Sequence, residues 1–287
     1  MSAALSTAQV REIVGAVTLL SAETARVVTR TGTVSEVAIA NSRGPYLGLA
    51  DVLYAGFYNA PRQPDTGAPD RDPEAFLVAL RAANALRRRY DRGQALPRES
   101  VTSQYGHYVM LGRPMHEAGT GRQVRFYWNL TIDGATAFVN EITRRFERAR
   151  IPFQAKLPVH PAGFARADGG VLYLGDDDVD ASIDAILATY AQLRTAMRAD
   201  VPFFTLPLAP GLSFAESPPN GDSFGMHRCD LVAEGLVRAH ESGAEGIDAR
   251  VDAVLGRLTA YGLETDRFAF NPTSRYPYRL GAFGAAA

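Results

Sequence analysis

The sequence predicts an α+β protein, with a mostly helical N-terminal region at residues 1–100 and a mixed α/β sheet domain at residues 101–287. Two segments of the first third, 7–30 and 74–93, carry apolar residues at helical spacing. After residue 100 the pattern changes to short segments of alternating apolar and polar residues, separated by amphipathic stretches. Strand, helix and strand in this order indicate a sheet covered by helices.

The N-terminal region is expected to contain two helices joined by an irregular segment. The first helix ends near Gly32, and its apolar face is formed by Val10, Ile13, Val14, Val17 and Leu20. The second helix begins after Asp72 and Pro73 and ends before Gly93, because an acid and a proline suit a helix start and a glycine suits its end. A role in binding a leader peptide or a partner protein is the hypothesis for this region.

The sheet domain follows from an ordered series of segments. Strands are expected at 103–111, 124–130, 151–157 and 171–178, and helices at 133–151, 179–198 and 247–263. Asp176, Asp177 and Asp178 precede a helix, so capping and solvation explain them better than a metal site does.

Composition excludes several classes of protein. The formal net charge is -1, so no overall field favours nucleic acid or an anionic membrane. No run of apolar residues is long enough to span a bilayer, and the N-terminus lacks the pattern of a secretory signal. The single Cys229 cannot form an internal disulfide, which fits a reducing cytoplasm.

Lys156 is the first candidate catalytic residue. It is the only lysine, so 29 of the 30 Lys and Arg residues are arginine. A desolvated lysine can lose its proton and act as a base, whereas arginine stays charged. A genome that favours arginine codons explains the bias equally well, so both interpretations stay open.

The strand at 124–130 is expected to have one apolar face and one polar face. Alternation places Arg125, Tyr127 and Asn129 together on the polar face, which suits an anion pocket. In the returning strand, Gln154 and Lys156 share one face.

Further candidates lie near the C-terminus. His227 and Arg228 follow a Gly/Pro-rich loop at the expected start of a helix, where backbone N–H groups favour anions. The aromatic, arginine-rich tail is expected to dock on the domain and to contribute Arg275 or Arg279. The chain has no phosphate-binding loop, dinucleotide fingerprint, zinc-binding HExxH or CxxC motif, and no metal is expected. A lysine base, a histidine acid and arginines that bind phosphate together describe β-elimination of phosphate.

Several ordered motifs carry a family resemblance. The run RFYWNLTIDGA, IPFQAK, VLYL, PFFTLPLAPGLSFAE and SFGMHRCDLVAEGL resembles the HopA-type effector-like proteins over roughly residues 100 to 260. Members of that family are type III effectors and lyase components in class V lanthipeptide and thioamitide biosynthesis. They are distantly similar to phosphothreonine lyases of the OspF and SpvC kind, which use a lysine base, a histidine acid and arginines that hold phosphate.

The resemblance implies a lyase that removes phosphate from phosphoserine or phosphothreonine of a precursor peptide and leaves dehydroalanine or dehydrobutyrine. Lys156 would abstract the Cα proton, and His227, or secondly His107, would be the acid. Phosphate and substrate would be bound by Arg125, Arg228, Tyr127, Asn129 and Arg275. No metal or organic cofactor is implied. The expected partner is a separate kinase-like protein, and the sequence does not fix the oligomeric state.

Two other functions stay open. A non-catalytic phosphopeptide-binding scaffold that partners a kinase would use the same arginines but would leave Lys156 exposed to solvent, with no acid nearby. A phosphotransferase subunit is the other, and the missing nucleotide motifs argue against it.

Overall fold

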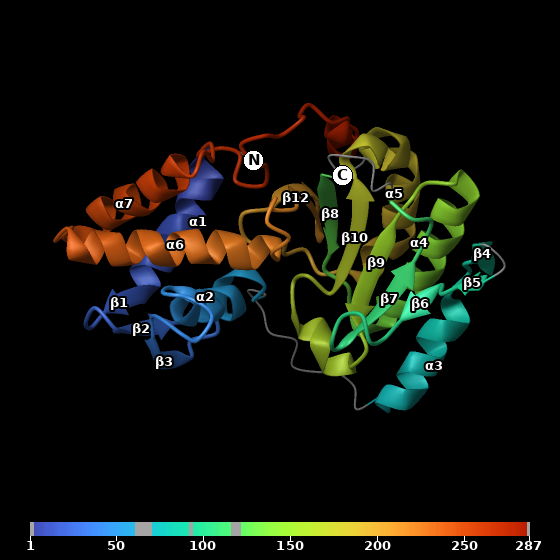
Figure 1. Cartoon of the computed structure of the whole chain (residues 1–287), viewed down its shortest axis with the longest axis horizontal. Helices are drawn as coiled ribbons and strands as arrows, with labels where there is room; N and C mark the ends of the chain where they lie inside the picture. The colour runs from blue at the N-terminus through green and yellow to red at the C-terminus, as the bar shows by residue number, and fades with distance from the viewer. Residues whose placement is uncertain (1–2, 61–70, 92–93, 116–121, 286–287) are drawn as a thin grey trace. The chain divides into compact units, whose positions relative to one another are not determined.

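The computed structural model describes residues 3–60, 71–91, 94–115 and 122–285 (Figure 1). These residues form helices, strands and short helical turns in an α+β arrangement, which confirms the predicted fold class. The chain divides into two compact units. Unit 1 comprises residues 1–64, 202–206 and 215–274, and unit 2 comprises residues 65–201, 207–214 and 275–287. No helix in the described ranges has the length and apolar character needed to cross a membrane.

Unit 1 combines helices with a small sheet. Its helices are α1 (Ala3–Ala16), α2 (Leu47–Leu53), the π-helical turn η1 (Tyr54–Tyr58), α6 (Phe224–Glu241) and α7 (Gly246–Ala260). Its antiparallel sheet has the order β1 (Val17–Leu19), β2 (Thr24–Val28) and β3 (Val34–Ala38). α6 packs along α7, and α1 also packs on α7.

The predicted helix at 7–30 is wrong beyond Ala16. Val10, Ile13 and Val14 are fully buried on α1, as the helical spacing predicted. From Val17 the chain is extended, because β-branched residues there alternate between buried and exposed positions in β2 and pair with β1 and β3. The N-terminal region is therefore less helical than expected.

Unit 2 is built around a larger sheet. The seven strands have the order β11-β12-β8-β10-β9-β7-β6. Their bounds are β6 (Glu99–Ser100), β7 (His107–Leu111), β8 (Gln123–Trp128), β9 (Gln154–Pro158), β10 (Gly170–Gly175), β11 (Leu206–Ala209) and β12 (Leu212–Glu216). A separate hairpin joins β4 (Arg89–Asp91) to β5 (Gln94–Leu96).

The helices of unit 2 are α3 (Pro73–Ala83), α4 (Ala135–Ala149) and α5 (Val179–Leu193). Short helical turns are η2 (Ile132–Gly134), η3 (Pro161–Ala165), η4 (Asp176–Asp178), η5 (Arg194–Ala196) and η6 (Leu280–Ala285). β8 and β9 both pair antiparallel with β10. β10 therefore lies between the two strands that α4 connects, although it comes later in the chain. The segments predicted from alternation at 103–111, 124–130, 151–157 and 171–178 all contain strands of this sheet.

The predicted helix at 74–93 ends earlier, at Ala83. Asp72 caps its start by accepting from the backbone N–H groups of Glu74 and Ala75, as expected. At the other end Asn84 is extended, and its buried side chain donates to the Tyr108 hydroxyl (2.9 Å). This contact ties the chain to the sheet, so Arg87 is not a helix-terminal arginine. Part of the irregular segment expected between the two helices is rich in proline, at residues 61–73, and most of this part lies outside the described residues.

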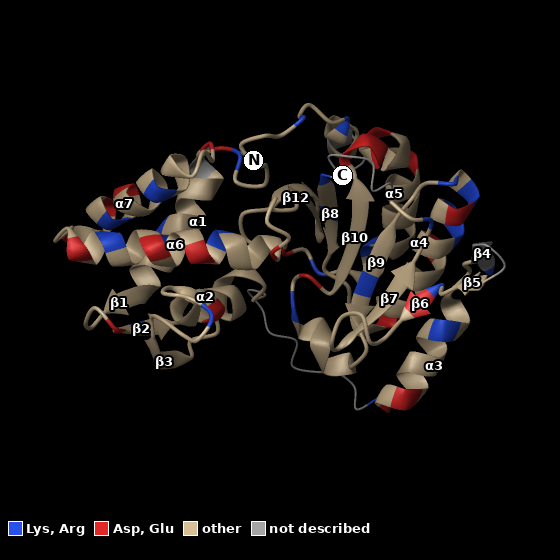
Figure 2. Cartoon of the chain, viewed as in Figure 1, with Lys and Arg blue, Asp and Glu red and all other residues tan. Residues whose placement is uncertain are grey.

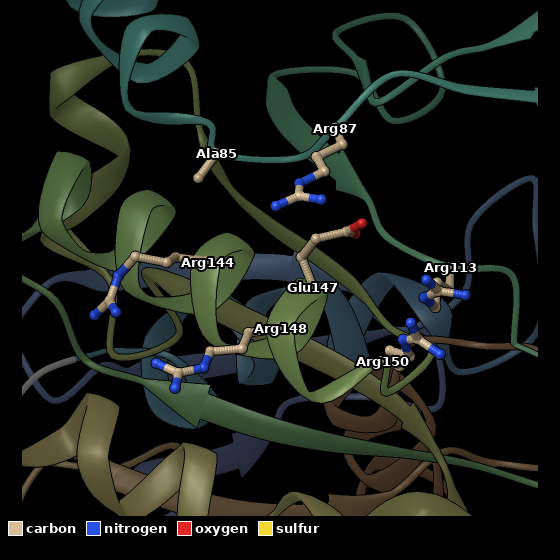
Figure 3. A pocket seen from close by; sticks show the side chains of 7 residues that line it. All are labelled: Ala85, Arg87, Arg113, Arg144, Glu147, Arg148 and Arg150. Carbon is tan, nitrogen blue, oxygen red and sulfur yellow. The ribbon is translucent and has the colours of Figure 1, made fainter.

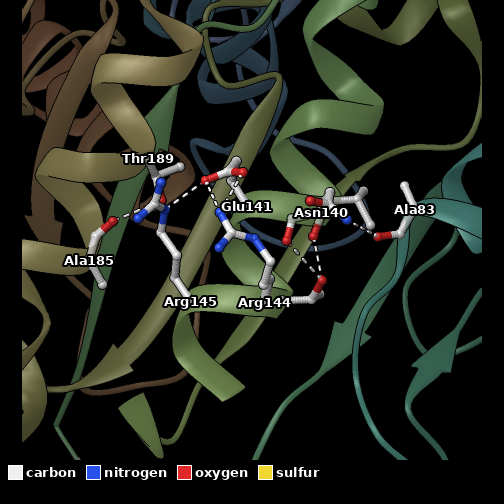
Figure 4. A network of polar contacts seen from close by, with 9 residues as sticks. Ala83, Asn140, Glu141, Arg144, Arg145, Ala185 and Thr189 are labelled. Carbon is white, nitrogen blue, oxygen red and sulfur yellow. Dashed lines mark hydrogen bonds and ion pairs between the residues drawn. The ribbon is translucent and has the colours of Figure 1, made fainter. Parts of the chain in front are cut away.

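α4 covers one face of the sheet in unit 2. Trp128 of β8 packs edge-on against Phe138 of α4, and Phe146 packs against Phe153, just before β9. On its other side α4 carries a polar network in which Glu141 accepts from Arg144 and Arg145, and this network holds both arginines in place (Figure 4).

The sequence-based boundary at residue 100 falls between β6 and β7, which pair with each other. The first change from one compact unit to the other comes after residue 64. Unit 1 also contains later parts of the chain, including α6 and α7.

Candidate active site

One face of the sheet in unit 2 brings polar residues from β8, β10 and β9 together. The register aligns Arg125 with Tyr173 and Tyr173 with Gln154 in one row. The neighbouring row aligns Tyr127, Val171 and Lys156. Side chains two residues apart on a strand share a face, so both rows lie opposite the face that α4 covers. The predicted polar faces of β8 and β9 therefore lie on the same side of the sheet.

Lys156 lies in a desolvated position on this face. Burial lowers the pKa of its ammonium group from 10.5 to about 8, and the charges of Arg125 and Arg166 act in the same direction, while Asp168 opposes them. Its Nζ lies 5.8 Å from the ring centre of Tyr173. A lysine with such a pKa is neutral in an appreciable fraction of molecules near neutral pH and can accept a proton.

Two arginines lie near Lys156. Arg125 is buried on β8, and its guanidinium carbon lies 5.4 Å from the centre of the same Tyr173 ring. Arg166, in the loop between β9 and β10, donates two hydrogen bonds of 2.8 Å to the carboxylate of Asp168. Because guanidinium groups bind phosphate oxygens in pairs, these positions suit a dianion beside Lys156.

His107 belongs to the same surroundings. It lies on β7, which pairs with β9, and burial and the charge of Lys156 lower its pKa below the usual value. Its Nδ1–H donates to the backbone carbonyl of Tyr105 (2.9 Å), because a carbonyl can only accept. Nε2 is the ring atom left to exchange a proton with a substrate.

His227 and Arg228 lie in unit 1, at the first turn of α6. Arg228 is fully buried and donates to the carbonyls of Phe268 and Phe270 and to the Asn271 side chain. These contacts hold the segment after α7 in place, and the role of Arg228 toward phosphate stays a prediction.

The ring of His227 is also engaged. Its Nδ1 accepts from the Arg228 guanidinium (2.8 Å), and burial, with that neighbouring charge, lowers its pKa to about 4. A histidine held neutral is a weak acid. The assignment of His227 as the acid stays a prediction, and the surroundings of His107 favour the second choice.

The other predicted substrate residues have different surroundings. Asn129 is fully buried, and its amide donates to the backbone carbonyl of Asp200 (2.9 Å), so it holds a loop. Arg275 forms ion pairs with Asp176 and Asp177 at the end of β10. Tyr127 lies in the row of Lys156 and is almost fully buried. Their roles toward substrate stay predictions.

Sequence reasoning missed Tyr173, Arg166 and Asp168. Tyr173 follows from the alternation in VLYLG once β10 is placed between β8 and β9. Arg166 and Asp168 lie in a loop, where no periodicity indicates the direction of a side chain.

Comparison with known proteins identifies the family. The family model of the HopA1 effector proteins matches residues 98–270, which is more than half of the chain. The chain belongs to the HopA1 effector protein family. Two solved structures share the fold of this HopA1-family chain. The effector protein from Pseudomonas syringae pv. tomato strain DC3000 is 20% identical to this chain, with a TM-score of 0.51. The match covers 81% of this chain and 91% of that protein.

The second structure is the effector protein from Pseudomonas syringae pv. syringae strain 61. It is 16% identical with a TM-score of 0.50, and the match covers 77% of this chain and 88% of that protein. No curated protein matches the HopA1-family chain. At these identities the structural likeness establishes the fold alone.

Proposed function

We propose that this protein is a lyase that eliminates phosphate from a phosphothreonine or phosphoserine residue of a peptide. The observation that supports this most strongly is the desolvated Lys156, whose pKa is lowered to about 8 beside two arginines and a histidine. A phosphopeptide-binding scaffold needs the arginines but does not need to bury its one lysine at a cost in stability.

The reaction assigns one task to each group. Arg125 and Arg166 hold the phosphate dianion, and their charge makes it a better leaving group. The neutral amine of Lys156 takes the Cα proton, the electron pair forms the Cα–Cβ double bond, and the Cβ–O bond breaks. His107 donates a proton from Nε2 to the leaving phosphate. Threonine phosphate gives dehydrobutyrine and inorganic phosphate, and serine phosphate gives dehydroalanine.

Asp168 and Tyr173 position the reacting groups. Asp168 orients the Arg166 guanidinium through two parallel hydrogen bonds, and the Asp168 side chain is only 8% exposed, whereas that of Arg166 is 41% exposed and stays accessible to a substrate. The Tyr173 ring lies against both Arg125 and Lys156. The ring is therefore placed to hold both side chains on this face of the sheet.

The family resemblance implies that the substrate is the precursor peptide of a lanthipeptide or thioamitide pathway. The phosphate would be installed by a separate kinase-like protein in the cytoplasm. The reaction needs neither a metal nor an organic cofactor, because two guanidinium groups supply the charge and a lysine supplies the base. The family's effector members fit a second role, a scaffold that holds phosphopeptide, which the same arginines could fill.

Release of inorganic phosphate from a synthetic phosphothreonine peptide tests the proposal. We expect release with wild type, a loss of at least about a thousandfold with Lys156→Ala, and near-normal rates with Gln192→Ala, an exposed neutral residue on α5. Equal rates for wild type and Lys156→Ala would remove the lysine from the mechanism. Tight peptide binding without release by wild type would favour the scaffold.

A further inference from the structure

A second basic site lies in unit 2, on the side of the sheet that α4 covers. A cavity of about 530 Å³ is lined by five arginines from three chain segments (Figure 3). These are Arg87 from the segment after α3, Arg113 after β7, and Arg144, Arg148 and Arg150 at the end of α4. Figure 3 shows them distributed around Glu147, the one acidic residue among the described residues of the lining. Five positive charges around one negative charge favour an anionic ligand.

Most of these arginines are available to a ligand. Arg144 is held by Glu141 (2.8 Å), whereas Arg87, Arg113, Arg148 and Arg150 form no ion pair with any residue of the described ranges. The Nε–H of Arg113 is buried and meets no acceptor in the described part of the chain. A buried donor without a partner is costly, and a carboxylate in the cavity would satisfy it. Figure 2 shows the basic residues that α4 contributes to this region.

An apolar cavity adjoins the basic one and shares Arg113 with it. This cavity has a volume of about 260 Å³, and its apolar lining includes Leu96, Leu111, Met115 and Phe153. The backbone of Arg113 is fixed here, because its carbonyl accepts from the Phe153 N–H (3.2 Å). The two cavities therefore form neighbouring parts of one surface, one suited to carboxylates and the other to an aliphatic side chain.

The apolar cavity reaches β9, the strand that carries Lys156. Its lining includes Gln154, which precedes Lys156 by two residues on β9 and shares its face of the sheet. Two residues of a strand span about 7 Å. A peptide that occupies both cavities can thus continue along β9 and deliver a later residue to Lys156.

We propose that these two cavities, joined at Arg113, bind an acidic and hydrophobic segment of the peptide substrate, separate from its phosphorylated residue. The inference rests on the proposed lyase function for the identity of the peptide, but not for the binding itself. A peptide fits better than a nucleic acid, because the described residues that line the basic cavity include no aromatic side chain to stack on a base. In the neighbouring cavity the one aromatic ring among the described residues, that of Phe153, already packs on Phe146. Such a site explains how a lyase selects one peptide among many phosphorylated proteins.

Fluorescence anisotropy with a phosphate-free probe tests this site without requiring catalysis. The probe is a fluorescein-labelled synthetic peptide of Glu, Asp and Leu, and its control has Gln and Asn in place of the acids. Arg148→Glu is compared with Arg194→Glu, because both arginines are exposed and lie at the end of a helix, but only Arg148 lines the cavity. We expect about tenfold weaker binding for Arg148→Glu and less than about twofold change for Arg194→Glu, as one charge-assisted contact is lost.

The apolar half has its own matched pair. Leu96→Asn is expected to weaken binding about fivefold, whereas Val78→Asn, an exposed aliphatic residue on α3, leaves it unchanged. Equal effects of the cavity and control variants, or equal affinity for the amide probe, would overturn the proposal. A single-stranded oligonucleotide of the same charge that bound more tightly than the peptide, with the same sensitivity to Arg148→Glu, would overturn the assignment to a peptide.

A phosphothreonine peptide made with and without the acidic segment separates this inference from the proposed function. Arg148→Glu should raise KM for the longer peptide only, at unchanged kcat. If no peptide loses phosphate while the probe still binds at Arg148, the proposed function fails and the binding site stands. If phosphate is released but Arg148→Glu changes neither binding nor KM, the inference about the cavities fails alone.

Discussion

Replacing Lys156 by methionine should stabilise the protein while abolishing its activity. Burial lowers the Lys156 pKa from 10.5 to about 8. At about 1.4 kcal/mol per pH unit, this shift means that the buried, charged lysine destabilises the folded protein by at most about 3.5 kcal/mol. Because local relaxation and water reduce such costs, we expect Lys156→Met to raise the free energy of unfolding by about 1 to 3 kcal/mol at pH 7. Residues needed for activity often reduce the stability of the folded protein, so a substitution that stabilises it by this amount is typical of a functional position.

The pH dependence of this gain identifies its cause. Below pH 8 the lysine is protonated in both the folded and the unfolded chain, so the full cost is present. Between pH 8 and 10.5 the folded chain has lost the proton and the unfolded chain has kept it, so the cost declines. Urea unfolding should therefore show a gain in the free energy of unfolding at pH 7 that falls to about a quarter by pH 10. Gln154→Met, on the same face, should show no pH dependence, and a destabilised Lys156→Met would refute the reasoning.

Three further predictions concern the individual residues. Between pH 7 and 10, kcat/KM of wild type should fall above about pH 8. Above that pH Lys156 is already neutral, while the fraction of molecules with a protonated His107 continues to decrease. His107→Gln should have a lower kcat/KM that becomes constant above about pH 8, because it has no acid left to lose a proton. Asp168→Asn should lower the Lys156 pKa, since the carboxylate raises it, and should move this break below pH 8 in the same profile. Arg228→Met should cost about 2 to 4 kcal/mol in urea unfolding, because it leaves buried carbonyls without donors, yet should leave kcat/KM of the folded protein within about twofold. An unshifted break, or a stable but inactive Arg228→Met, would contradict the roles given to these residues.

Local pattern predicted the sheet well and the N-terminal region less well. Alternation located β8 and β9 because each strand has one face on the side of α4 and one polar face, whereas β10 was recognised from the apolar run VLYL. The segment at 17–28 was predicted as helix because the spacing of its apolar residues also fits one face of a helix. Its extended conformation depends on pairing between β1, β2 and β3, which local spacing does not reveal. The early end of α3 at Ala83 likewise depends on a distant contact, from Asn84 to Tyr108.

The candidate site was predictable where it lies on strands. Arg125 and Lys156 share a face because alternation fixes the direction of each side chain, and the pairing with β10 then brings the two together. Arg166 and Asp168 could not be found, since loop residues have no such rule. The sequence also does not reveal that the Arg228 guanidinium donates to the backbone carbonyls of Phe268 and Phe270, and its predicted role as a phosphate ligand stays a prediction.

The mass of the product formed from a phosphothreonine peptide tests the central claim most directly. Elimination yields a peptide that has lost the elements of phosphoric acid and carries dehydrobutyrine, and we expect this product with wild type and not with Lys156→Ala. A product that carries threonine would show hydrolysis and contradict the role of Lys156 as a base at Cα. Recovery of unchanged phosphopeptide, bound but intact, would contradict a lyase and leave the protein as a phosphopeptide-binding scaffold.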